Sequence, residues 1–73
     1  MTRVIKGVKM TAYSRDGVII RQRIKILDDE GNLVKAPVIE VREKKKHDKE
    51  PLDEVKKRAE KRLEEKLRQV MRE

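Results

Sequence analysis

The sequence predicts an α+β fold in which a three-stranded antiparallel meander (β-β-β) packs against one long C-terminal α-helix. Two N-terminal stretches alternate apolar and polar residues with the period of two that β-strands have. The last third of the chain repeats apolar residues at spacings of three and four, which is the period of an amphipathic helix. At 73 residues the chain is expected to form one domain over 1–73, with the meander over 3–43, a polar connector over 44–50 and the helix over 51–72.

The first strand is predicted from about Arg3 to Tyr13, and the turn Ser14–Gly17 follows it. The Asp-Gly pair in this turn is expected to adopt the positive φ angles of tight hairpins. Strict alternation places Lys9 on the face opposite to most apolar residues of the strand. The other face is expected to point toward the core. Its residues are Val4, Lys6, Val8, Met10 and Ala12.

The second strand, predicted from Val18 to Leu27, has the clearest alternation in the chain. Its apolar face has Gln22 as the one polar residue among Val18, Ile20, Ile24 and Ile26. The opposite face carries three cations and no anion, namely Arg21, Arg23 and Lys25. The simplest alternative for such a face is an ordinary solvated sheet surface. That surface would mix charges of both signs, so this face is the leading candidate for a binding surface.

A second turn is predicted over Asp28–Asn32, with Gly31 as its left-handed residue. The third strand is expected to run from Leu33 to Glu43. It should lie at a sheet edge, because Pro37 within it has no N–H to donate. A β-bulge near Ala36-Pro37 would explain why the apolar residues before and after the proline differ in parity.

The helix is predicted to have Pro51 in its first turn, followed by Asp53 and Glu54, which favour the positive end of the helix dipole. The basic residues of its other side, Arg58 and Arg62 among them, alternate with glutamates and are expected to form an outward-facing lattice of i,i+4 pairs. The apolar stripe that should pack on the sheet consists of Leu52, Val55, Ala59, Leu63, Leu67, Val70 and Met71.

Positive charge is concentrated in the first third of the chain. Residues 1–27 contain seven basic residues against Asp16 alone, and the whole chain has a formal net charge of +7. An excess of one sign on rigid structure makes a directed field that attracts a partner of the opposite sign. The predicted nucleic-acid-binding residues are those of the basic strand face, its strand neighbours and the connector, namely Arg21, Arg23, Lys25, Lys9, Lys35, Lys44, Lys45 and Lys46.

These features predict a small basic nucleic-acid-binding module that contacts the phosphate backbone of duplex DNA or structured RNA through the exposed basic face of the sheet. Single-strand binding by base stacking is disfavoured, because Tyr13 is the only aromatic residue. Two alternatives remain open. One is a protein-interaction or assembly subunit of ribosomal, viral or homodimeric type, and the other is an idealised or designed scaffold without natural function.

No enzymatic activity, metal, other cofactor, small-molecule substrate or membrane partner is expected. The chain has no Cys, a single His and three isolated glycines, so it lacks metal-ligand clusters and phosphate-cradling loops. No apolar run could span a bilayer and the N-terminus lacks the apolar segment of a signal peptide, so a cytoplasmic location is the default expectation. Because a core of this size stabilises the fold by a small margin, a homo-oligomer or a larger assembly remains an open alternative.

Overall fold

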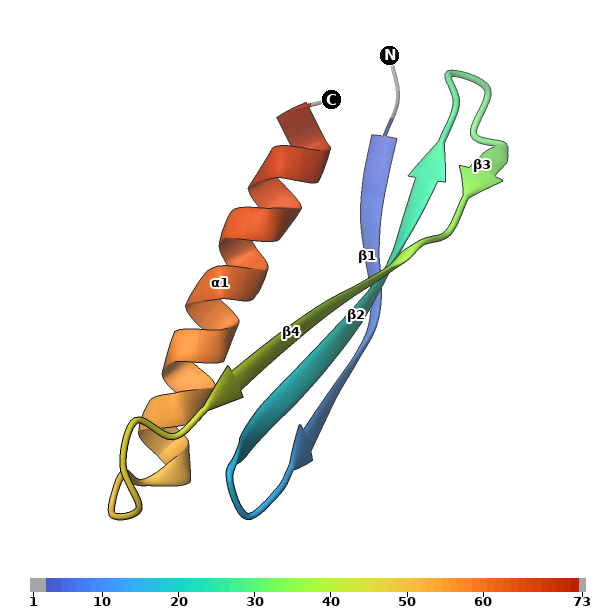
Figure 1. The fold of residues 1–73 in the computed structure, drawn as a ribbon. Helices are drawn as coiled ribbons and strands as arrows, with labels where there is room; N and C mark the ends of the chain where they lie inside the picture. The colour runs from blue at the N-terminus through green and yellow to red at the C-terminus, as the bar shows by residue number, and fades with distance from the viewer. Residues whose placement is uncertain (1–2, 73) are drawn as a thin grey trace.

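The computed structural model describes residues 3–72 and confirms an α+β fold with an antiparallel sheet and one C-terminal helix. The helix packs against one face of the sheet and leaves the other face uncovered (Figure 1). Among the described residues, no helix combines the length and the apolar character needed to cross a membrane. The elements in chain order are β1 (Arg3–Tyr13), β2 (Gly17–Leu27), β3 (Leu33–Lys35), β4 (Val38–Lys44) and α1 (Leu52–Arg72).

The sheet has four strands rather than the predicted three, because the third predicted strand is broken at Ala36-Pro37 into β3 and β4. Proline has no N–H, so the ladder of backbone hydrogen bonds is interrupted there. β2 is central, as expected for a meander. It pairs antiparallel with β1 on one side and with both β3 and β4 on the other.

The predicted bulge lies just before Ala36-Pro37: the pairing of β3 with β2 shifts by one residue between Leu33 and Lys35, and the proline itself adds no further shift. The register of β2 with β3 at Lys35 continues without a shift to β4 at Val38. Across the gap, the Ile24 N–H donates to the Pro37 carbonyl oxygen at 3.1 Å. This hydrogen bond keeps the two short strands in line, so the chain crosses the proline without gaining an extra residue.

A second irregularity of the bulge type lies in β1. The pairing with β2 shifts by one residue between Lys6 and Lys9, so Gly7 and Val8 share one partner position. The Gln22 side chain, which is only 5% exposed, donates from Nε2 to the Gly7 carbonyl oxygen at 2.7 Å. That hydrogen bond satisfies a carbonyl that the irregular ladder would otherwise leave unpaired. An extra residue reverses the alternation of faces beyond it.

The bulge overturns the predicted faces of β1 beyond Gly7. Met10 pairs with Arg21 and Ala12 pairs with Ile19, so both lie on the sheet face away from α1 rather than in the core. For the same reason Lys9, which alternation predicts on the opposite face, lies on the α1 side of the sheet.

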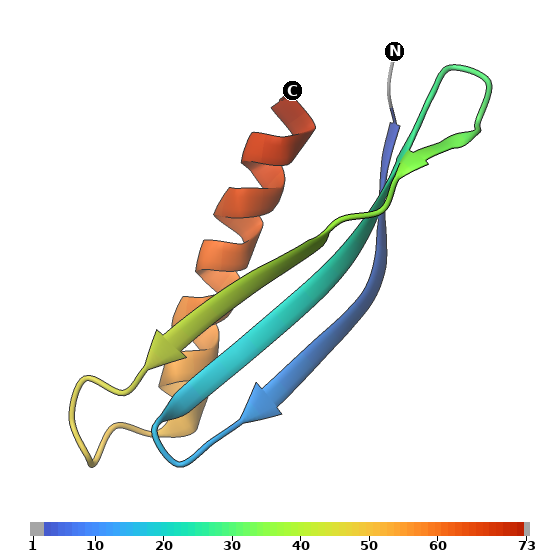
Figure 2. The same ribbon diagram turned by 45° about the vertical axis from the view of Figure 1, so that its right-hand side comes forward.

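The core lies between α1 and the strands β2 and β4, along which the helix runs (Figure 2). Alternate residues of β2 point toward α1, as their spacing predicts, and meet the apolar stripe of the helix. The buried apolar side chains are Val18, Ile20, Ile24, Val41, Val55, Ala59, Leu63 and Leu67.

The two hairpin turns differ in what they require of glycine. Gly31 adopts the predicted left-handed conformation, with a φ of 84°. Gly17 does not have a positive φ, which corrects the expectation for the Asp-Gly pair. A Cβ atom at this position would instead overlap the Glu43 carbonyl oxygen of β4. The close approach of β4 therefore explains the glycine at position 17.

Candidate functional site

The sheet face that points away from α1, which we call the open face, is the basic face of β2. Alternation along the strand places Arg21, Arg23 and Lys25 there, and all three are exposed. β4 continues the series, because Arg42 and Lys44 pair with the next open-face positions of β2. Each successive level of the β2–β4 side therefore carries one cation. We call these residues the cation row: Lys25, Arg23, Arg21, Arg42 and Lys44.

The cation row is a regularly spaced line of positive charge. Open-face positions two residues apart on a strand are separated by roughly 6.6 Å, so the row extends over about 27 Å. Arg42 is missing from the residues that the sequence predicts for the site. The face of β4 depends on the register beyond Pro37, and the sequence pattern leaves that register open.

Glu40 lies level with Arg21 and is ion-paired to two members of the cation row. Its carboxylate oxygens accept from Arg21 Nε at 2.7 Å and from Arg42 Nε at 2.9 Å. These hydrogen bonds, first from Arg21 and then from Arg42, lower the pKa of Glu40. The side chains of Arg21 and Arg42 remain 57% and 65% exposed. Glu40 therefore orients two guanidinium groups and cancels part of their charge, but it does not cover them.

The other three members of the row differ from Arg21 and Arg42 in their ion pairing. Within the described residues, no ion pair involves Arg23, Lys25 or Lys44. Arg23 donates from Nη1 to the Ala36 carbonyl oxygen at 3.4 Å, which is a weak contact with a neutral group.

Two of the predicted binding residues lie on the other side of the sheet. Lys9 is placed there by the bulge in β1, and its Nζ is 3.8 Å from Glu60 Oε1 on α1. Lys35 pairs with Ile26, whose side chain packs against the core, so the register assigns Lys35 to the α1 side as well. Neither lysine adds to the charge of the open face.

The connector between β4 and α1 extends the basic surface at one end of the sheet. It lies beside the hairpin of β1 and β2 (Figure 2), and the Lys45 N–H donates to the Asp16 carbonyl oxygen at 2.7 Å. A shallow pocket of about 490 Å³ lies between the two loops. It is lined by Arg15, Asp16, Lys44, Lys45, Lys46, His47 and Asp48. The two carboxylates offset part of the positive charge, so the pocket favours anions less than the cation row does.

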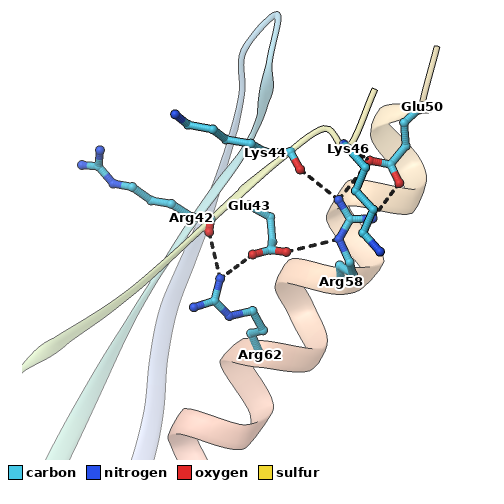
Figure 3. A network of polar contacts seen from close by, with 7 residues as sticks. All are labelled: Arg42, Glu43, Lys44, Lys46, Glu50, Arg58 and Arg62. Atoms are coloured by element: carbon cyan, nitrogen blue, oxygen red, sulfur yellow. Dashed lines mark hydrogen bonds and ion pairs between the residues drawn. The ribbon is translucent and has the colours of Figure 1, made fainter. Parts of the chain in front are cut away.

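A network of ion pairs ties α1 to β4 and the connector (Figure 3). Arg58 donates from Nη1 to Glu50 Oε2 at 2.6 Å and from Nε to Glu43 Oε1 at 3.2 Å. Arg62 also pairs with Glu43. Hydrogen bonds from Arg58, and then from the Lys46 N–H, lower the pKa of Glu50 to about 2. The pKa of Glu43 is lowered mainly by Arg62, and partial burial opposes this change.

The same two arginines also hold the backbone of the cation row from the opposite side of the sheet. Arg62 donates to the Arg42 carbonyl oxygen at 3.1 Å, and Arg58 donates to the Lys44 carbonyl oxygen at 2.9 Å (Figure 3). The expectation that Arg58 and Arg62 belong to an outward-facing lattice is therefore wrong. Spacing along the helix does not reveal acidic groups that the fold brings in from β4 and the connector.

β1 adds exposed apolar side chains to the open face, and three of them, Val8, Met10 and Ala12, are predicted in the core by strict alternation. Val8 and Met10 are 71% and 67% exposed. Two shallow hollows of about 120 and 170 Å³ lie beside Met10, and Arg21 lines both of them. We call the open-face residues of β1 the apolar strip: Ile5, Val8, Met10 and Ala12.

Comparison of the chain with protein-family models, curated proteins and solved structures found no match, so the function has to be inferred from the residues themselves. In the part of the chain that the structure describes, no group of three or more His, Cys, Asp or Glu residues could hold a metal ion. The open face offers hydrogen-bond donors and positive charge in a line, together with apolar surface beside it. Such a surface is chemically suited to an extended anion.

Proposed function

We propose that this protein binds duplex DNA or structured RNA through the open face of its sheet, with the cation row along one phosphate backbone. The observation that supports the proposal is the line of five cations on a rigid sheet, of which Arg21 and Arg42 share a carboxylate and the other three form no ion pair within residues 3–72. Guanidinium and ammonium groups donate charge-assisted hydrogen bonds to phosphate oxygens, and such contacts supply most of the sequence-independent affinity for nucleic acid.

The spacing of the row suits this partner. Its levels are roughly 6.6 Å apart, which is comparable to the distance between successive phosphates along one strand. A single backbone could therefore contact every level over the length of the row. The network around Arg58 and Arg62 favours the same use, because it fixes the backbone of β4 and so reduces the ordering cost of binding.

Base stacking contributes little to this mode of binding. Tyr13 is the only aromatic residue of the chain, and it pairs with Val18 on the α1 side of the sheet. Binders of single strands rely on aromatic platforms that stack successive bases. The proposed partner is accordingly a helical nucleic acid whose phosphates are held in a regular line.

The test compares two variants that change the net charge equally. The first reverses three charges of the cation row: Arg21→Glu, Arg23→Glu and Lys25→Glu. The second reverses Lys57, Lys61 and Arg68, which are exposed and lie within about 40° of one another on α1, away from the sheet. Gel retardation is measured with duplex DNA, structured RNA and single strands at two salt concentrations.

The row variant is expected to lose retention of the duplexes, and the helix variant to keep most of it. Both triple substitutions fall on exposed positions, so circular dichroism should show both proteins folded. Equal retention by the two variants would refute the assignment to the open face, because binding would then follow net charge alone.

A further inference from the structure

The apolar strip is exposed beside a highly charged surface, and the packing of the core does not explain it. Val8 and Met10 do not contribute to the buried core, whereas their neighbours on the open face are the arginines of β2. Adjacent strands are about 4.8 Å apart, so the strip runs one strand away from the β2 part of the cation row. Exposed apolar patches with a polar border commonly mark contact surfaces.

A second copy of this chain is a poor occupant for the strip. Two open faces packed together would bring two cation rows into contact, and like charges would repel. Edge pairing through β1 is also disfavoured, because its bulge and the charged side chains of Lys6 and Lys9 obstruct strand addition. A membrane surface suits the strip less well, because interfacial anchoring uses a wide apolar face, often with Trp or Phe; the strip is a single strand wide and the chain contains neither residue.

We infer that the apolar strip contacts the methyl groups of thymine bases in the major groove of duplex DNA. This inference rests on the proposed function. When the cation row follows one backbone, the neighbouring strand β1 lies over the adjacent groove. The thymine methyl is the apolar group that base edges present in the major groove, and aliphatic side chains recognise it.

The hollows beside Met10 fit this role. Each combines the apolar surface of Met10 with the guanidinium-bearing side chain of Arg21. A methyl group seated there is shielded from water, while the guanidinium remains free to reach a phosphate or the edge of a guanine. RNA fits less well, because uracil lacks the methyl group and the major groove of A-form helices is too deep and narrow for side chains.

The test uses two DNA duplexes of one sequence, the second with deoxyuridine in place of every thymine. The phosphates are identical, so the salt dependence of binding should be equal. The thymine duplex should bind about fourfold more tightly for each methyl group that the strip buries. The double variant Val8→Ser, Met10→Ser should bind both duplexes equally, whereas Met71→Ser, on an exposed methionine of α1, should keep the preference.

Each outcome decides between the inference and its alternatives. Equal affinity of the unmodified protein for the two duplexes, with a steep salt dependence, overturns the inference and leaves the proposed function standing. Binding to neither DNA duplex overturns the inference, and it overturns the proposed function as well if structured RNA is not retained either. Self-association or binding to anionic vesicles that depends on Val8 and Met10 would assign the strip to a different partner and overturn the inference. The comparison of duplexes with the unmodified protein is decisive even if the double variant fails to fold.

Discussion

Neutralising the carboxylate within the cation row should strengthen binding to nucleic acid. Glu40 is ion-paired with Arg21 and Arg42, and its lowered pKa keeps it charged at neutral pH. In the proposed complex its negative charge lies beside the phosphates and competes with them for both guanidinium groups. The substitution Glu40→Gln removes that charge but keeps the size of the side chain. Because exposed ion pairs contribute little to stability, the variant should fold.

The magnitude follows from the number of charges on the row. Each neutralised phosphate contributes about 0.9 to the slope of log K against log salt, so five cations less one carboxylate give a slope of about −3.6. With Gln at position 40 the slope becomes about −4.5, and the affinity at 0.1 M salt rises about eightfold. Between 50 and 200 mM salt the original protein should lose about 150-fold in affinity and the variant about 500-fold.

Fluorescence anisotropy with a labelled duplex at four or five salt concentrations measures both quantities. Glu65→Gln is the matched control, because Glu65 is exposed on α1 and its loss changes the net charge by the same amount. The control should leave the slope unchanged. Weaker binding by Glu40→Gln would show that Glu40 acts by positioning its two arginines, and an unchanged slope would place the phosphates elsewhere. Either result would refute the competition argued here.

Two further predictions concern the stability of the fold. The pKa of Glu50 is about 2 in the folded state against an ordinary value of 4.5, so its stabilising effect is complete above about pH 4.5 and is lost as the pH falls toward 2. Thermal unfolding midpoints should decline over this interval, less steeply in an Arg58→Met variant, and parallel curves for the two proteins would contradict the role of the ion pair. The substitution Gly17→Ala should lower the free energy of unfolding by about 1–3 kcal/mol in urea titrations, because its Cβ atom would overlap the Glu43 carbonyl oxygen and push β4 away from β2. Unchanged stability would mean that β4 can move aside at no cost.

Residues close together in the chain carried most of the information about the secondary structure. The alternation of β2 and the apolar stripe of α1 are local periods. Each can be recognised within its own segment without reference to the rest of the fold. For that reason the open-face positions of Arg21, Arg23 and Lys25 follow from the pattern of a single strand. The break at Pro37 was also foreseeable as a weakness in the ladder, although its form was not.

The residues predicted on the wrong face of the sheet share one cause. The face of Lys9 and Met10 depends on the bulge at Gly7, which is stabilised by the side chain of Gln22 on the neighbouring strand. No periodicity within β1 reports on that hydrogen bond. The face of Arg42 likewise depends on how the chain crosses the proline and resumes its pairing with β2.

From its sequence alone, this chain can be assigned an α+β fold, an excess of positive charge near the N-terminus and one strand face that carries three cations and no anion. Tertiary pairing decided that Arg42 and Lys44 extend this face into a row, that Lys9 and Lys35 leave it, and that apolar side chains of β1 lie beside it. The physical reason is that side-chain direction within a strand follows from local backbone geometry. The register between strands is set instead by hydrogen bonds with residues far away in the chain, and a shift of one residue exchanges the two faces.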